Sequence, residues 1–200
     1  STGRPYFLFV STLEPRKNLL RLLSAYEIFV AQSERAGRPA GTIPDLHLVG
    51  PMGWKKSTLR GTLDQLQTTG RVHLLDYRYG NDLWTRYRRA RALLFPSLHE
   101  GFGFPTLEAM AAGLPVMTSN RGAMAEVGGD CVLLVDPEDP QAMAARMMTL
   151  AWDQAVVDDL RTRGRVRARE WTWRRTADET CAAYEALLVD DPRHLSAKPS

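Results

Sequence analysis

The sequence lacks any long apolar run, and so it predicts no transmembrane helix. It also lacks a basic segment followed by an apolar one at its start, and so no signal peptide is visible. Cysteine is scarce: Cys131 and Cys181 are the only two, with no C-x-x-C motif and no histidine beside either. This usage favours reduced, buried thiols in a cytoplasmic protein over a disulfide framework.

Metal-binding patterns and strong charge are also missing. No Asp-x-Asp occurs and the four histidines are scattered, so we expect no metal and no cofactor. The formal net charge of +3 is too small to indicate a nucleic-acid partner. The arginines do crowd between Arg161 and Arg175. A solvated helix face is the simpler interpretation, and a peripheral contact with the inner face of an anionic membrane is the alternative.

What the sequence does contain is a regular alternation of short apolar runs with segments of helical periodicity. The runs are continuous rather than alternating, which is typical of parallel strands buried on both faces. We therefore predict a doubly wound, Rossmann-like α/β domain that binds ligands at the carboxyl ends of its strands. From residue 140 to about residue 188 we expect helix, with a break near residues 171–173. The predicted strands are residues 6–10, 45–50, 71–77, 91–98, 114–119 and 131–137.

The turn after the fourth apolar run carries the strongest functional signal. Gly101 and Gly103 follow a strand and precede a helix, where backbone N–H groups can approach a phosphate without a Cβ in the way. Glu100 stands before this turn and Glu108 after it, so both carboxylates can face one cleft. Carboxylates accept paired hydrogen bonds, and a sugar or ribose diol donates them.

The whole segment EGFGFPTLEAMAAGLPV, residues 100–116, closely resembles the donor-binding motif of retaining GT-B glycosyltransferases of group 1. Similar matches are FVSTLEPRKNL, LVGPMGW, RGAMAEVGGD and WTWRRTADETCAAYEALL, so the resemblance covers nearly the whole chain. It implies that residues 1–188 are the C-terminal, nucleotide-sugar-binding half of a GT-B fold. Residues 189–200 would be a flexible tail, and the N-terminal acceptor domain would be absent. The first residue is serine rather than methionine, which fits a fragment of a longer protein.

The resemblance gives a role to each carboxylate and to the turn between them. It implies that Glu100 contacts hydroxyls of the transferred sugar and that Glu108 contacts the ribose of the nucleotide. It also implies that backbone N–H groups hold the diphosphate or the sugar, namely those of Phe102, Gly103 and Phe104.

A cationic loop near the start completes the implied site. Lys17 matches a family lysine that stabilises the departing diphosphate, and Arg16 beside it takes a second cationic role. The position where the family often has an arginine falls at Ser11 and Thr12. Cations at the start of a helix oppose its dipole, so this placement favours an anionic ligand.

Further candidates lie around these two loops. The loop containing Tyr77 and Arg78 is where the family holds the nucleobase, and either side chain could stack on a base. His99 either lines the site or orients the loop. The remaining donor-binding candidates are Gly101, Thr106 and Thr12.

These features predict retaining transfer from a nucleoside-diphosphate sugar to a glycan or a lipid-linked acceptor. TLEPRKN is similar to transferases that use GDP-mannose, which favours that donor. We expect the chain alone to bind donor without transferring sugar. The alternatives are a stand-alone nucleotide-sugar-binding module and a non-transferring GT-B enzyme such as an epimerase or phosphorylase. A dinucleotide oxidoreductase is disfavoured, because TSNR stands where that fingerprint needs an acid.

Overall fold

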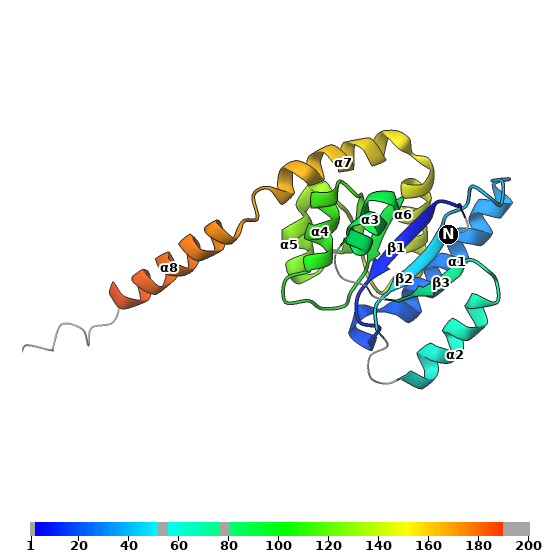
Figure 1. Ribbon diagram of the computed structural model, residues 1–200, viewed down its shortest axis with the longest axis horizontal. Coiled ribbons are helices and arrows are strands. Elements are labelled where there is room, and N and C mark those ends of the chain that lie inside the picture. The colour runs from blue at the N-terminus through cyan, green and yellow to red at the C-terminus, as the bar shows by residue number, and fades with distance from the viewer. Residues whose placement is uncertain (1–2, 52–55, 77–80, 190–200) are drawn as a thin grey trace, which may run out of the picture. The chain divides into compact units, whose positions relative to one another are not determined.

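The computed structural model describes residues 3–51, 56–76 and 81–189. The chain divides into two compact units, Ser1–Ala168 and Arg169–Ser200. Figure 1 shows the first unit as a sheet with helices on both of its faces. The site candidates all belong to this first unit, so its architecture decides where they lie.

A single sheet of six parallel strands forms the centre of the first unit, in the order β3-β2-β1-β4-β5-β6. The order reverses beside β1, which pairs with both β2 and β4. This is the switch point at which open α/β sheets bind their ligands. The predicted fold class is confirmed. The strands are β1 (Tyr6–Val10), β2 (Asp45–Val49), β3 (Val72–Leu75), β4 (Ala92–Phe95), β5 (Val116–Ser119) and β6 (Leu133–Val135).

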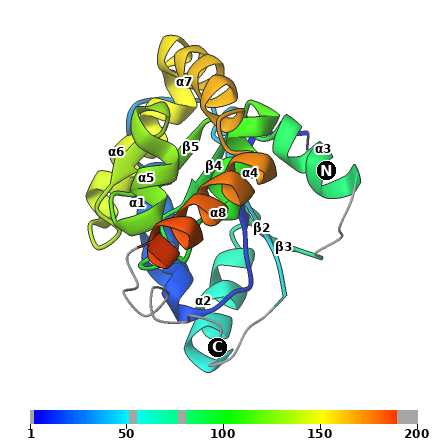
Figure 2. The ribbon, with the colours of Figure 1, turned by 90° about the vertical axis from the view of Figure 1, so that its left-hand side faces the viewer.

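The helices form two layers around this sheet. One layer holds α1 (Leu19–Arg35), α2 (Lys56–Gln67) and α6 (Pro140–Trp152), with α1 packed on α6. The other holds α3 (Asn81–Arg89), α4 (Phe104–Ala112), α5 (Gly122–Gly128) and α7 (Gln154–Ala168). Here α4 lies against α3, α5 and α7 (Figure 2). Two short 3-10 turns, η1 (Pro15–Lys17) and η2 (Gly129–Cys131), complete the unit.

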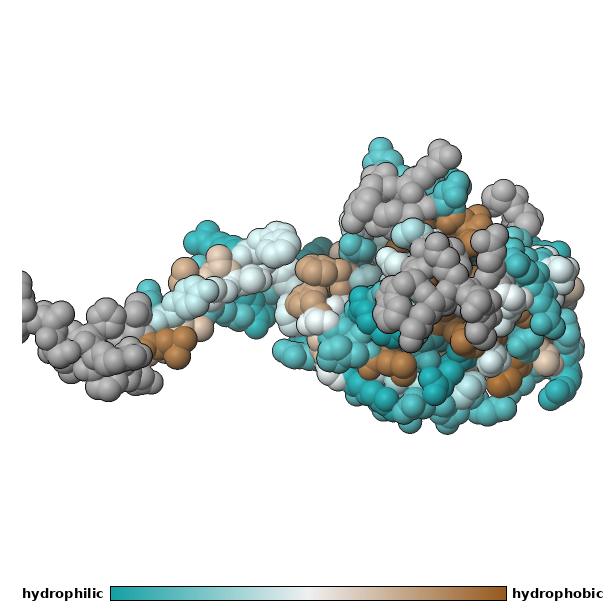
Figure 3. Space-filling view, turned by 90° about the horizontal axis from the view of Figure 1, so that it is seen from below, coloured by the Kyte–Doolittle hydropathy of each residue, from teal (hydrophilic) through white to brown (hydrophobic). Residues whose placement is uncertain are grey.

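The central strands β1 and β4 are continuous apolar runs because both of their faces are covered. Phe7, Phe9 and Phe95 are 0% exposed, and the ring of Phe7 meets that of Phe29 on α1 edge-on at 5.3 Å. Burying a side chain of this size contributes about 1.5–3 kcal/mol to the free energy of unfolding. The face of the molecule in Figure 3 is mostly hydrophilic with scattered apolar side chains. The core therefore fixes the strand ends that carry the site.

The loop after β1 is held against the end of β2 by a close backbone approach. Gly50 has φ 152°, and a Cβ there would lie 1.8 Å from the carbonyl oxygen of Ser11. The backbone N–H of Ser11 donates to Val49 at 3.0 Å, and that of Leu13 donates to Pro51 at 2.9 Å. Only glycine allows this contact, so residue 50 fixes the course of the loop that leads to Arg16 and Lys17.

The second unit consists of α8 (Trp173–Val189) and the residues that flank it. The predicted break near residues 171–173 is confirmed, because Trp171 and Thr172 lie outside any helix. The expectation of two buried thiols is wrong for Cys181, which is exposed on α8, whereas Cys131 is buried. A single helix has no second element to cover its faces. No helix in the described part of the chain is long and apolar enough to cross a membrane.

Candidate functional site

Two loops that lie far apart in the sequence meet at the carboxyl edge of the sheet, beside the switch point. Lys17 belongs to η1 after β1, and Glu100 lies in the loop between β4 and α4. The ammonium Nζ of Lys17 donates to Oε1 of Glu100 at 2.5 Å. A guanidinium nitrogen, Nη1 of Arg16, donates to Oε2 of the same carboxylate at 2.9 Å. The structure thus brings together the three residues predicted to act on the sugar and the diphosphate.

The ion pair between Lys17 and Glu100 is largely removed from water. Lys17 is 7% exposed as a residue, and its ammonium lies 5.3 Å from the centre of the Phe95 ring. The Glu100 side chain is 9% exposed. A buried charge without a partner is strongly unfavourable, so each of the two groups needs the other.

The electrostatics fix the charges of this cluster at neutral pH. Burial alone would raise the pKa of Glu100, but Lys17, together with Ser97 and Arg16, outweighs burial and lowers that pKa below its ordinary value. Burial would lower the pKa of Arg16, but Glu100 and Glu14 outweigh it and raise that pKa. The guanidinium of Arg16 is shared, since its Nε also lies 2.6 Å from Glu14. Glu100 is therefore an ionised, acceptor-only group between two cations.

Asn18 holds the two loops in place, a role that the sequence analysis missed. It is buried and has φ 61°, the left-handed region that Asn tolerates better than most residues. Its side-chain Nδ2 donates to the carbonyl oxygens of Pro96 at 3.1 Å and Pro137 at 2.5 Å. These carbonyls follow β4 and β6, so Asn18 joins three loops at the sheet edge. Its place in the EPRKN motif, directly after two cations, is the signal that could have identified it.

The glycine turn leads directly into α4. Gly103 precedes the first residue of α4 and has φ 92°, and a Cβ there would lie 3.4 Å from Cγ of Met124. The rings of Phe102 and Phe104 lie 4.8 Å apart over the turn, and Phe104 is 52% exposed. The start of a helix presents N–H groups and partial positive charge, which suit an anion.

Glu108 has a different partner from Glu100. It lies in α4, and its Oε2 accepts a hydrogen bond of 2.8 Å from the hydroxyl of Tyr87 on α3. Tyr87 is 1% exposed, so its hydroxyl is fixed by the packing of its ring. The sequence analysis missed Tyr87, because at its position in a helix it reads as a core residue. One carboxylate of the site is thus held by cations and the other by a neutral donor.

The other candidates have varied settings. His99 is exposed, and its carbonyl oxygen accepts from Arg16 at 3.4 Å. Thr12 and Gly101 are exposed at the same edge. Thr106 is buried, and its hydroxyl has no hydrogen-bond partner in the described part of the chain. Tyr77 and Arg78 lie outside the described residues.

The described residues contain no cluster of three or more His, Cys, Asp or Glu side chains that could hold a metal ion. Lys17 and Arg16 both contribute positive charge to this site. The arrangement can bind an anion beside a group of hydroxyls and can stabilise negative charge that develops on a leaving group.

Comparisons with known proteins give a family match and a sequence relative. Residues 1–171 match the family described as "Glycosyl transferases group 1". The chain is 35% identical over 182 residues to the O-antigen chain mannosyltransferase B of Escherichia coli, covering 91% of this chain and 46% of the relative.

Solved structures give the same fold. The sucrose-phosphate synthase of Thermosynechococcus elongatus aligns with a TM-score of 0.74 at 26% identity, covering 96% of this chain and 47% of that one. The HepE protein of Anabaena, solved with UDP and glucose, aligns with a TM-score of 0.74 at 21% identity, covering 92% of this chain and 49% of that one. The chain spans about half the length of these relatives.

Proposed function

Since the chain belongs to the glycosyl transferases group 1 family, we propose that it is the donor-binding half of an enzyme that transfers mannose from GDP-mannose with retention of configuration. The observation that carries the proposal is the cluster of Lys17, Arg16 and Glu100 beside the start of α4. The two cations of such a cluster can bind a diphosphate, and its carboxylate can accept hydrogen bonds from sugar hydroxyls. Several of the relatives are named as mannosyltransferases, which favours mannose as the transferred sugar.

The diphosphate can bind without breaking the Lys17–Glu100 pair. An ammonium group has three donors and a guanidinium has five, so each cation can hold Glu100 and a phosphate oxygen together. The N–H groups at the start of α4 and the helix dipole add to the attraction. As the bond to the sugar breaks, negative charge grows on the diphosphate, and these fixed cations stabilise it more than they stabilise the ground state.

The two carboxylates divide the rest of the donor between them. Each oxygen of Glu100 already accepts one bond and keeps a lone pair for a hydroxyl of the sugar. Glu108, held by Tyr87 through one oxygen, offers the other to the ribose diol. Glu100 positions the sugar and supplies negative charge rather than acting as a nucleophile, because two hydrogen-bonded cations make its carboxylate a weaker nucleophile.

The acceptor is a glycan or a lipid-linked saccharide that binds through an N-terminal domain outside this chain. This part of the proposal is supported by the share of the relatives that the chain covers, about half. The active cleft then lies between the two halves, with the edge that carries Glu100 and Lys17 as one wall.

Calorimetry tests the donor assignment directly. The chain is titrated with GDP-mannose, UDP-glucose, GDP and UDP in excess chelator, and we expect GDP-mannose to bind best. Lys17→Met should weaken the binding of every nucleotide by about tenfold or more, since a charged hydrogen bond is lost. The control is Arg146→Gln, which removes an exposed cation on α6 and should leave binding unchanged. Equal binding by the parent and Lys17→Met, or no binding once metal is chelated, contradicts the proposal.

A further inference from the structure

A second concave surface lies on the flank of the sheet, away from the cluster of Lys17 and Glu100. It is a pocket of about 840 Å³ between α3, α4 and α7. Its floor is formed by Ala111 and Ala112, at the far end of the helix whose first turn faces the donor site. At 1.5 Å per residue, Phe104 and Ala111 are about 10 Å apart along the axis of α4. The pocket is therefore distinct from the proposed donor site.

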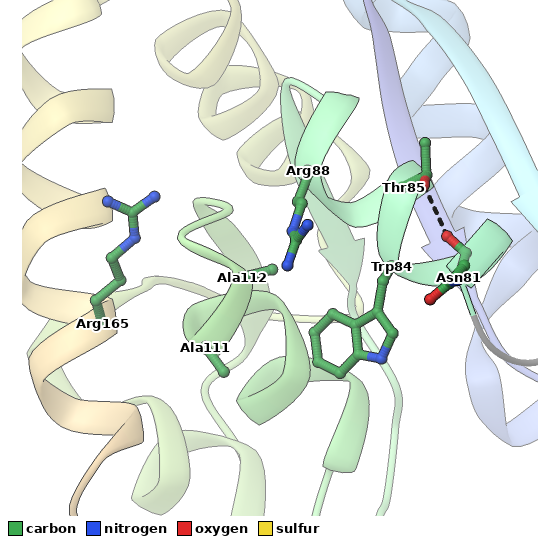
Figure 4. A pocket seen from close by; sticks show the side chains of 7 residues that line it. All are labelled: Asn81, Trp84, Thr85, Arg88, Ala111, Ala112 and Arg165. Carbon is green, nitrogen blue, oxygen red and sulfur yellow. Dashed lines mark hydrogen bonds between the residues drawn. The ribbon is translucent and has the colours of Figure 1, made fainter.

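Two arginines on different helices line this pocket. Figure 4 shows Arg88, from α3, and Arg165, from α7, on opposite sides of the two alanines. Both side chains are exposed, and neither forms an ion pair in the part of the chain that the structure describes. No acidic side chain is among the described residues that line the pocket. Two like charges that line one recess without a described counter-ion repel each other, and an anionic ligand that contacts both would relieve this repulsion.

The approach of Arg165 depends on the residue that ends α4. Gly113 has φ 71°, and a Cβ there would lie 2.2 Å from Nε of Arg165. The guanidinium group thus lies in contact with the bare backbone at the end of α4. The recess continues past this point into a smaller one of about 380 Å³, which is also lined by Arg88, Arg165 and Arg161. Arg161 pairs with Asp158 at 3.3 Å, so Arg88 and Arg165 are the cations of the recess without a described carboxylate partner.

The third wall is aromatic. Trp84 is 41% exposed and lies four residues before Arg88, so both side chains project from the same face of α3. Its ring is supported from behind by that of Tyr87, with the ring centres 5.9 Å apart. An exposed indole beside a charged group offers an apolar platform for the C–H face of a sugar ring, and arginine binds phosphate in a two-pronged geometry.

From this combination we propose that the pocket between α3, α4 and α7 is a second ligand site, which takes a phosphorylated saccharide with its phosphate between Arg88 and Arg165 and its ring on Trp84. The volume lies in the range of small-molecule sites, about 300–1,000 Å³, and accommodates a hexose phosphate. This site is independent of the nucleotide-binding role proposed for Lys17 and Glu100. Binding of the phosphorylated saccharide in this pocket involves no covalent step.

The indole N–H resonance of Trp84 gives a readout inside the pocket. The chain is labelled with ¹⁵N, and the resonance is assigned by its loss in Trp84→Phe. Titration with mannose 6-phosphate should shift this resonance with saturation. Inorganic phosphate should bind more weakly, and methyl mannoside, which lacks the phosphate, should cause no shift.

Two sets of variants separate this site from the donor site. Arg88→Gln and Arg165→Gln should each weaken mannose 6-phosphate binding by about tenfold or more, because each removes a charged hydrogen-bond donor. Arg146→Gln removes the same charge on the other face of the sheet and should leave the affinity unchanged. Lys17→Met should also leave it unchanged, even if it abolishes nucleotide binding.

Three results would overturn the proposal. The first is an affinity for mannose 6-phosphate that Arg88→Gln and Arg165→Gln leave intact. The second is a shift that Lys17→Met removes, which would assign the binding to the donor site. The third is binding only to vesicles of anionic phosphatidylglycerol, with no response of Trp84 to mannose 6-phosphate, which would make these arginines a membrane contact.

Discussion

The ammonium of Lys17 lies 2.5 Å from Oε1 of Glu100, and each of these nearly buried groups is the counter-charge of the other. Removing Glu100 leaves Lys17 as an uncompensated charge away from water, and removing Lys17 leaves Glu100 with Arg16 as its remaining cation. The pair therefore links the stability of the carboxyl edge to its chemistry.

The first prediction concerns this pair and stability. Lys17→Met should lower the free energy of unfolding by about 1–3 kcal/mol, since a charged hydrogen bond is lost and Glu100 loses its main counter-ion. The double variant Lys17→Met, Glu100→Gln should recover part of that loss, because the nearly buried carboxylate that has lost Lys17 is also removed. Urea unfolding of the four proteins of this double-mutant cycle measures the coupling. Strictly additive losses would show that the two groups do not depend on each other.

The second prediction is a pH dependence. The pKa of Glu100 in the folded chain lies below its ordinary value of 4.5. A carboxyl with a lowered pKa contributes stability that is complete above about pH 4.5 and is lost as the pH falls through the folded-state pKa. The free energy of unfolding should therefore fall less steeply below pH 4.5 in Glu100→Gln than in the parent chain. Urea unfolding between about pH 3 and pH 7 checks this, and parallel curves would contradict it.

The third prediction separates the two halves of the donor. Glu108→Ala should weaken the binding of free GDP by about tenfold or more, because the contact with the ribose is lost. Tyr87→Phe should have a smaller effect in the same direction, because it only loosens the orientation of Glu108. Glu100→Ala should affect GDP-mannose much more than GDP. Calorimetry with both ligands measures these differences.

A double variant controls for indirect effects of Tyr87. If Tyr87 acts through Glu108, Tyr87→Phe should change nothing further in the Glu108→Ala background. If Glu100→Ala and Glu108→Ala both bind free GDP like the parent chain, the assigned roles are wrong.

The fourth prediction concerns Asn18. Asn18→Gly keeps the left-handed backbone accessible but removes the bonds to Pro96 and Pro137, whereas Asn18→Ala also adds backbone strain. Both variants should lower the free energy of unfolding, and that of Asn18→Ala should be the lower of the two by about 1 kcal/mol. Both variants should also weaken GDP binding, although we assign Asn18 no direct contact with the ligand. Thermal unfolding and calorimetry measure the two effects, and unchanged GDP affinity would limit Asn18 to a structural role.

The sheet could be predicted from the sequence because burial on both faces makes its central strands continuous apolar runs. Runs such as those of β1 and β4 therefore stand out without any alternation. Glu100 and Lys17 could be assigned to one region, because both follow strands whose carboxyl ends meet at one edge. Their direct ion pair could not, since it joins side chains 83 positions apart and depends on how the loops turn.

Other features of the site are not visible in a sequence pattern. Asn18 acts through a left-handed backbone angle and two carbonyl groups, and neither is encoded by spacing. Tyr87 reads as a core residue of α3, and only the packing of α3 on α4 brings its hydroxyl to Glu108. The pocket with Arg88 and Arg165 combines three helices from separate parts of the chain. Tertiary packing decides all three.

The last prediction concerns activity. The chain supplies Glu100, Glu108 and Lys17 but, as proposed, neither the acceptor site nor the opposite wall of the cleft. Holding both reactants in register contributes about 7–11 kcal/mol toward lowering the barrier, so half a cleft loses most of the rate. The chain should bind GDP-mannose and transfer no sugar, with at most slow hydrolysis of the donor by water. An upstream domain of the same family, added in cis or as a separate chain, should restore transfer. Release of GDP with and without a saccharide or polyprenyl-linked acceptor measures this, and acceptor-dependent turnover by the chain alone would refute the two-domain proposal.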